Sequence, residues 1–190
     1  MIPFIQNRSY RRFFQNEQIL EDQLRLMVEA ARLSPSSRNI QPIKFFVCND
    51  SEMNSHIFPN LGWAGYLKEW AGPEEGERPS AYIILLHDTS IAPAYSCDNG
   101  IFAQSILLQA VDLGFGGCMI ATFKKDEITK LLRLPNYMTP ILVIALGKPK
   151  EVVVIDDIKM GDVKYWRDAA GIHHVPKRSL DELIYIPDNE

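Results

Sequence analysis

The chain has 190 residues, of which 46% are hydrophobic and 23% are charged, and its 20 basic and 24 acidic side chains give a net charge of −4. These values are typical of a folded globular protein with one core, and the acidic balance argues against a nucleic-acid partner, which normally requires a basic face. No run approaches the roughly 20 apolar residues that cross a bilayer, and no signal peptide is recognisable, so we expect a cytoplasmic protein without a membrane partner.

The first clear element is an amphipathic helix. Apolar residues recur at helical spacing between Leu20 and Ala31, and the pattern stops before Pro35. Turn-forming residues at 35–39 then predict a loop, and the β-branched and aromatic residues at 43–48 predict a strand.

Residues 50–79 are the least regular part of the chain, because glycines and prolines break them into short pieces. Such a stretch is either a lid over a pocket or an ordinary mobile excursion. Several large aromatic residues here and later in the chain could stack on a substrate ring, with core packing as the alternative. They are Trp63, Tyr66, Trp70, Tyr165 and Trp166.

The second half alternates between apolar runs and turn residues. We expect a strand at 81–87, a buried helix from about 98 to 113, a strand at 118–121, a helix at 125–132 and a strand at 139–146. After Lys150 the sequence becomes polar and irregular. Because helices and strands do not alternate strictly, an α+β fold is favoured over a doubly wound α/β sheet.

The glycines at 114, 116 and 117 could be mistaken for a nucleotide-binding loop. A dinucleotide-binding glycine motif follows a strand and opens a helix, whereas these glycines close a helix and lead into a strand. We therefore expect Gly114 to cap the helix in the left-handed conformation.

Two segments carry side chains suited to a ligand. Arg8, Ser9 and Arg11 offer guanidinium and hydroxyl donors, and in an extended chain Ser9 and Arg11 project to the same side, where both could reach one anion. The amides of Asn39 and Gln41 could bind a heteroaromatic ring or a polyol. The alternatives are a solvated basic segment and a turn with local side-chain caps.

Together these segments resemble the nitroreductase family of flavoproteins. The likeness lies in Arg8-Ser9-x-Arg11-x-Phe13 and Pro35-Ser36-x-x-Asn39-x-Gln41-Pro42-x-x-Phe45, and it continues at 98–104, 107–110, 113–116, 146–149 and 176–180. It covers nearly the whole chain apart from residues 50–79.

The resemblance implies one domain over residues 1–190, with a central, mostly antiparallel sheet flanked by helices. It implies an intertwined homodimer with FMN at the subunit interface, a variable, lid-like excursion at 50–79, and an extension at 150–190 that completes the flavin site. The implied FMN ligands are Arg8, Ser9 and Arg11 with Lys177 or Arg178 at the phosphate end, Pro35, Ser36, Ser37 and Asn39 from the partner, and Ile120, Ala121 and Thr122 along the reactive N5 edge.

The implied activity is electron transfer from NADH or NADPH to a small organic acceptor, such as a nitroaromatic or a quinone, by a ping-pong mechanism. No catalytic side chain is expected, because the isoalloxazine carries the redox chemistry. Two alternatives stay open: a specialised enzyme of the same fold (dehalogenase, dehydrogenase or flavin reductase), and a flavin-binding or storage protein without turnover.

Two positions depart from the family pattern. Asn7 stands where a second arginine is common, which weakens the phosphate site or shifts it toward Lys177, and Ile43 stands where tryptophan is common. Neither change removes a group that the redox chemistry requires.

The histidines and cysteines offer weaker candidates. We expect no metal at His173 and His174, because neighbours in an extended chain point to opposite sides and no cysteine or acidic cluster lies at ligand spacing. A pocket or dimer contact is favoured for this pair. Cys48, Cys97 and Cys118 are expected to be free thiols in a reducing compartment, with Cys118 buried and inert in its apolar strand.

Overall fold

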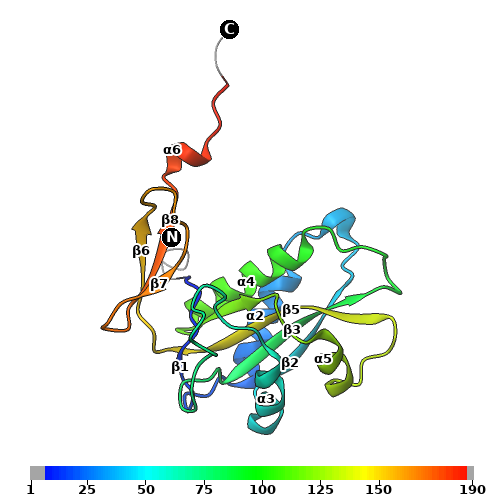
Figure 1. Cartoon of the computed structure of the whole chain (residues 1–190). Helices are drawn as coiled ribbons and strands as arrows, with labels where there is room; N and C mark the ends of the chain where they lie inside the picture. Colours follow the sequence, from blue (N-terminus) through cyan, green and yellow to red (C-terminus); the bar gives the residue numbers. More distant parts are fainter. Residues whose placement is uncertain (1–6, 188–190) are drawn as a thin grey trace.

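The computed structural model describes residues 7–187. Its centre is a five-stranded sheet in which all paired strands are antiparallel, as the family resemblance implied (Figure 1). The order is β1 (Phe13–Phe14), β5 (Met138–Pro149), β3 (Ala81–Asp88) and β2 (Ile43–Cys48), and β4 (Gly116–Ile120) also pairs with β5.

Helices cover both faces of this sheet. Helices α2 (Glu21–Arg32) and α4 (Asp98–Asp112) pack on one face, and α3 (Ser51–Ile57) and α5 (Lys125–Leu131) pack on the other (Figure 1). Successive side chains of a strand point to opposite faces, so Ile83 joins the core under α2 and α4, while the neighbouring Ile84 joins the core under α3 and α5. Since both faces are covered, all eight residues of β3 are buried.

The glycine-rich turn after α4 is only partly as expected. Gly114 has a φ of +81°, which confirms the left-handed cap. Gly116 and Gly117, however, lie within β4, and the strand therefore begins two residues earlier than predicted. A Cβ on Gly116 would lie 2.6 Å from the ring of Tyr10, and one on Gly117 would collide with the carbonyl oxygen of Ala145. These glycines therefore allow close packing of β4.

The irregular stretch at 50–79 contains one short helix. Asp50 caps α3, because its side chain accepts a hydrogen bond of 2.8 Å from the backbone N–H of Met53. The 3₁₀ turn η2 (Phe58–Asn60) follows directly. No regular element is assigned between Leu61 and β3.

The prediction of an irregular C-terminal part was wrong. After Lys150 the chain forms a three-stranded sheet with β6 (Val153–Asp157) parallel to β8 (His173–Lys177), and β7 (Trp166–Arg167) antiparallel to β8. This small sheet stands to one side of the main sheet, and α6 (Leu180–Leu183) continues away from it (Figure 1). No helix in the described part of the chain is long and apolar enough to cross a membrane.

Candidate functional site

A pocket of about 150 Å³ lies beside the end of β4. Four segments that are distant in sequence line it, and seven of the residues predicted to contact the flavin or a substrate ring are among them. The lining residues are Ser9, Arg11, Gly62, Trp63, Ala64, Cys118, Met119, Ile120, Ala121, Thr122 and Tyr165.

The N-terminal segment reaches the pocket by pairing with β4. Ser9 forms a parallel bridge with Gly117, and the N–H of Tyr10 donates to the carbonyl oxygen of Gly117 over 3.1 Å. In this extended backbone Ser9 and Arg11 both line the pocket, as their spacing predicted, while the ring of Tyr10 packs against Gly116. A hydroxyl and a guanidinium are thereby placed in one wall.

Side chains of the C-terminal extension hold Arg11 in place. One guanidinium nitrogen of Arg11, Nη1, lies 2.8 Å from Nε2 of His173 and donates to the carbonyl oxygen of Ser9 over 3.2 Å. The guanidinium carbon lies 4.6 Å from the centre of the Tyr165 ring, a cation–π contact.

The backbone of this segment is fixed by a buried carboxylate. The side chain of Glu151 is fully buried, and it accepts a hydrogen bond of 2.9 Å from the N–H of Arg11. Its other oxygen pairs with Arg167 at 2.7 Å and lies 3.9 Å from Nε of Arg12. These cations compensate the buried negative charge.

The two histidines point to opposite sides, as expected for neighbours in a strand. His173 is fully buried against Arg11, and burial together with the charge of Arg11 lowers its pKa to about 4. His174 instead lies 2.8 Å from Asp156 of β6 and 3.5 Å from Asp168, and it stacks on Trp166. Within residues 7–187, no group of histidine, cysteine and acidic side chains could hold a metal ion.

The aromatic candidates separate into two groups. Trp63 and Tyr165 line the pocket, and Tyr66 contacts Tyr165 with ring centres 4.9 Å apart. Trp70 packs edge-on against Trp63 and under the guanidinium of Arg167. Trp166 lines a different pocket on the small sheet. The 63–70 segment is therefore joined to the C-terminal extension beside the pocket.

The second predicted segment lies outside this pocket. A fully buried carboxylate at the start of α4, Asp98, accepts hydrogen bonds from the Ser36 hydroxyl at 2.6 Å and from the Ser37 N–H at 2.9 Å. Asn39 and Gln41 have positive φ values of 57° and 55°, and their side-chain amides bond to each other at 3.1 Å. The local caps considered from the sequence are thus formed, and strained backbone of this kind often accompanies a binding site. Pro35 precedes this turn and is exposed.

The remaining basic candidates do not line the pocket either. Lys177 is the exposed last residue of β8, and Arg178 lies 3.4 Å from Glu182 in α6. The guanidinium of Arg8 donates to the carbonyl oxygen of Asn7 over 2.7 Å.

Sequence reasoning missed several residues that shape the site. Glu151 and Arg167 lie in a stretch without a periodic pattern, and their contacts join residues up to 140 positions apart. Gly62 adjoins Thr122 so closely that a Cβ would lie 2.9 Å from the threonine methyl group. A local sequence signal exists only for the glycine.

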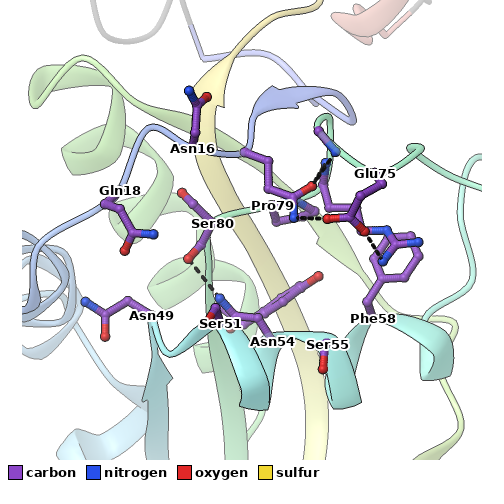
Figure 2. A pocket seen from close by; sticks show the side chains of 14 residues that line it. Asn16, Gln18, Asn49, Ser51, Asn54, Ser55, Phe58, Glu75, Pro79 and Ser80 are labelled. Atoms are coloured by element: carbon purple, nitrogen blue, oxygen red, sulfur yellow. Dashed lines mark hydrogen bonds and ion pairs between the residues drawn. The ribbon is translucent and has the colours of Figure 1, made fainter.

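A larger pocket, of about 650 Å³, lies between α3 and residues 75–80 (Figure 2). Amide and hydroxyl side chains dominate it, and Asn54 donates to the carbonyl oxygen of Ser80 over 2.9 Å. Its charged residues neutralise each other, because Arg78 pairs with Glu75 at 2.7 Å. None of the residues predicted for the site lines it, so the smaller pocket remains the candidate despite its size.

A comparison with models of known protein families shows which family this chain belongs to. The model of the nitroreductase family matches residues 5–148. The chain belongs to the nitroreductase family. This confirms the resemblance seen in the two N-terminal motifs and agrees with the antiparallel sheet covered by helices on both faces.

Individual nitroreductase-family relatives are distant. A protein of Archaeoglobus fulgidus, provisionally assigned as an NADH dehydrogenase or NAD(P)H nitroreductase, is 28% identical over 79% of this chain and 86% of its own length. The FMN reductase (NADPH) of Bacillus subtilis is 22% identical over 78% of this chain and 65% of its own. The solved structure of an FMN-dependent nitroreductase from Clostridium difficile aligns with a TM-score of 0.64 at 24% identity, covering 80% of this chain and 88% of that chain.

Proposed function

We propose that this chain binds FMN in the pocket beside β4 and passes electrons from NADH or NADPH to a small organic acceptor, such as a nitroaromatic or a quinone. Donor and acceptor would occupy the same site in turn, in a ping-pong mechanism. One observation carries the proposal: Ser9 and Arg11, whose side chains are donors suited to an anion, share a pocket with an aromatic wall and with residues 120–122. The names of the Bacillus and Clostridium relatives support the choice of cofactor.

The side chains present fit this cofactor. Ser9 and Arg11 are donors suited to phosphate oxygens. In the pocket wall, the aromatic rings of Trp63 and Tyr165 provide surfaces on which a planar ring can stack. When bound, FMN supplies the hydride chemistry, while the protein binds and orients it and limits its contact with water.

A second copy of the chain would complete the site. Pockets that enclose a cofactor measure about 300–1,000 Å³, whereas this pocket measures about 150 Å³. The flavin ligands proposed at 35–39 lie outside it and would come from the partner. Lys177 and Arg178 would close on the phosphate, with the extension at 150–190 as part of one flavin-binding domain.

The electron-transfer proposal is tested on the purified protein. We expect a yellow protein, or one that becomes yellow with added FMN, whose flavin absorption bleaches when NADH or NADPH is added without oxygen. Failure to bind added FMN contradicts the proposal. Bound flavin that neither nucleotide bleaches favours a storage protein, and one acceptor far above all others in kcat/KM favours a specialised enzyme.

The position of the phosphate is tested by the double substitution Arg8→Ala and Lys177→Ala. Removing two cations from the proposed phosphate end should give flavin-poor protein after gel filtration. The control is Lys130→Ala, which removes an exposed cation on α5 and should leave the flavin content unchanged. Full flavin content in the double variant contradicts this assignment of Arg8 and Lys177.

A further inference from the structure

The contact between Arg11 and His173 fixes the form of the histidine. An arginine guanidinium has only hydrogen-bond donors, so at 2.8 Å the Nε2 atom of His173 must be the acceptor. The neutral ring then carries its proton on Nδ1. This atom is buried and has no hydrogen-bond partner among the described residues.

We infer that His173 is a positioning residue for Arg11: its neutral ring accepts a hydrogen bond from the guanidinium and holds it in the pocket wall, ready to bind the phosphate of FMN. The inference rests on the proposed function. It assigns a role to a side chain that does not line the pocket itself.

The surroundings of His173 keep its ring neutral. Arg11, Arg167 and His174 oppose a further positive charge, only the carboxylate of Glu151 favours one, and the Tyr165 ring packs 5.2 Å away. Burial is the largest effect, and the pKa falls to about 4. A protonated ring would donate from both nitrogens and repel Arg11, so at neutral pH the ring stays neutral and its Nε2 accepts from Arg11.

These contacts reduce the loss of side-chain conformational entropy when Arg11 binds an anion. A free arginine side chain must lose conformational freedom when it binds, and a guanidinium that is already held does not. Here His173 contacts one edge, Tyr165 covers the face at 4.6 Å, and Glu151 holds the backbone N–H at 2.9 Å. The guanidinium of Arg11 is thereby fixed before any ligand arrives.

Binding of FMN and riboflavin to the same variants separates positioning from a purely structural role. Riboflavin has the same ring and ribityl chain but no phosphate. We expect His173→Leu to raise the Kd for FMN about tenfold, the usual order for a hydrogen bond to a charged group, and the Kd for riboflavin less than about twofold. His173→Gln keeps an acceptor oxygen and should restore most of the FMN affinity. Without the guanidinium, in an Arg11→Ala background, His173→Leu should have no further effect on FMN binding.

Three results would overturn the inference while leaving the proposed function intact. They are equal losses for FMN and riboflavin, additive effects of the Arg11 and His173 substitutions, and a proton on Nε2 of His173 in nitrogen NMR spectra of the flavin-free wild type. The NMR measurement needs no variant, so it decides the case even if His173→Leu fails to fold. A wild-type protein that binds neither flavin overturns the inference and the proposed function together.

Discussion

At the residue scale, we expect Arg167 to contribute strongly to folding stability, because its ion-pair partner is buried. It lies 2.7 Å from Glu151, whose side chain is fully buried. Because removal of one partner leaves an uncompensated charge, Arg167→Met should lower the free energy of unfolding by about 3 kcal/mol. Chemical denaturation measures this value, and the matched control is Arg25→Met, which breaks an exposed pair with Glu21 and should cost less than about 1 kcal/mol. Equal effects would show that the charge of Glu151 is compensated without Arg167.

The three cysteines differ in burial, and we expect this difference to set their reactivity. Cys97 is exposed, whereas burial raises the pKa of the Cys118 thiol to about 12 and also raises that of Cys48. A raised pKa keeps a thiol protonated at pH 8, and the thiolate is the reactive form. A thiol reagent at pH 8 should therefore modify one cysteine of the native protein rapidly and all three only after unfolding. Rapid labelling that persists in Cys97→Ser would contradict the burial of the other two.

At the level of elements, β4 has glycine at positions where a strand residue normally carries a packed side chain. Substitution of Gly117 tests whether close packing against β5 is the reason. A Cβ at Gly117 would collide with the Ala145 carbonyl of β5, and backbone cannot move as readily as a flexible side chain. We expect Gly117→Ala to lower the midpoint of thermal unfolding and to disturb the adjoining pocket. Gly100, in α4, has open space around its Cβ position, so Gly100→Ala should raise stability by about 0.5–1 kcal/mol. If both variants behaved alike, close packing would not explain Gly117.

Elements with a strong periodic pattern could be predicted from the sequence, and those held by distant contacts could not. The strand expected at 43–48 has the observed bounds, and the helix expected from about 98 to 113 is within one residue of its observed end. The small sheet was missed because β6 and β8 are short, lie 15 residues apart and have no simple alternation. Contacts such as His174 with Asp156, which the sequence does not reveal, join these strands.

The same distinction applies to the candidate site. Ser9 and Arg11 could be placed on one side of the chain because a strand alternates regularly. The positions of Glu151 and His173 could not be predicted, because they meet Arg11 across 140 and 162 residues of sequence. The alternation of side chains along a strand predicts that the guanidinium of Arg11 reaches the pocket. Only the folded chain shows that Glu151 and His173 hold Arg11 there.

At the scale of the whole molecule, exposed apolar residues in the C-terminal segment lead us to predict that two copies of the chain associate through it. Leu183 and Ile186 are 67% and 77% exposed at the end of a segment that extends away from the body (Figure 1). Exposed apolar side chains grouped in this way are typical of a surface that a partner covers. We expect sedimentation to give a species of twice the 21.7 kDa of one chain, with FMN bound.

Introducing charge into this segment should separate the copies. Burial of each large apolar side chain contributes about 1.5–3 kcal/mol, so Leu183→Asp with Ile186→Asp should weaken association more than about a hundredfold. If the partner supplies residues 35–39 to the flavin site, the monomer produced in this way should also lose FMN. Met160→Asp, at a fully exposed turn, is the control and should leave the dimer intact. A wild-type monomer that binds FMN would contradict the shared site, and a dimeric double variant would show that other surfaces hold the copies together.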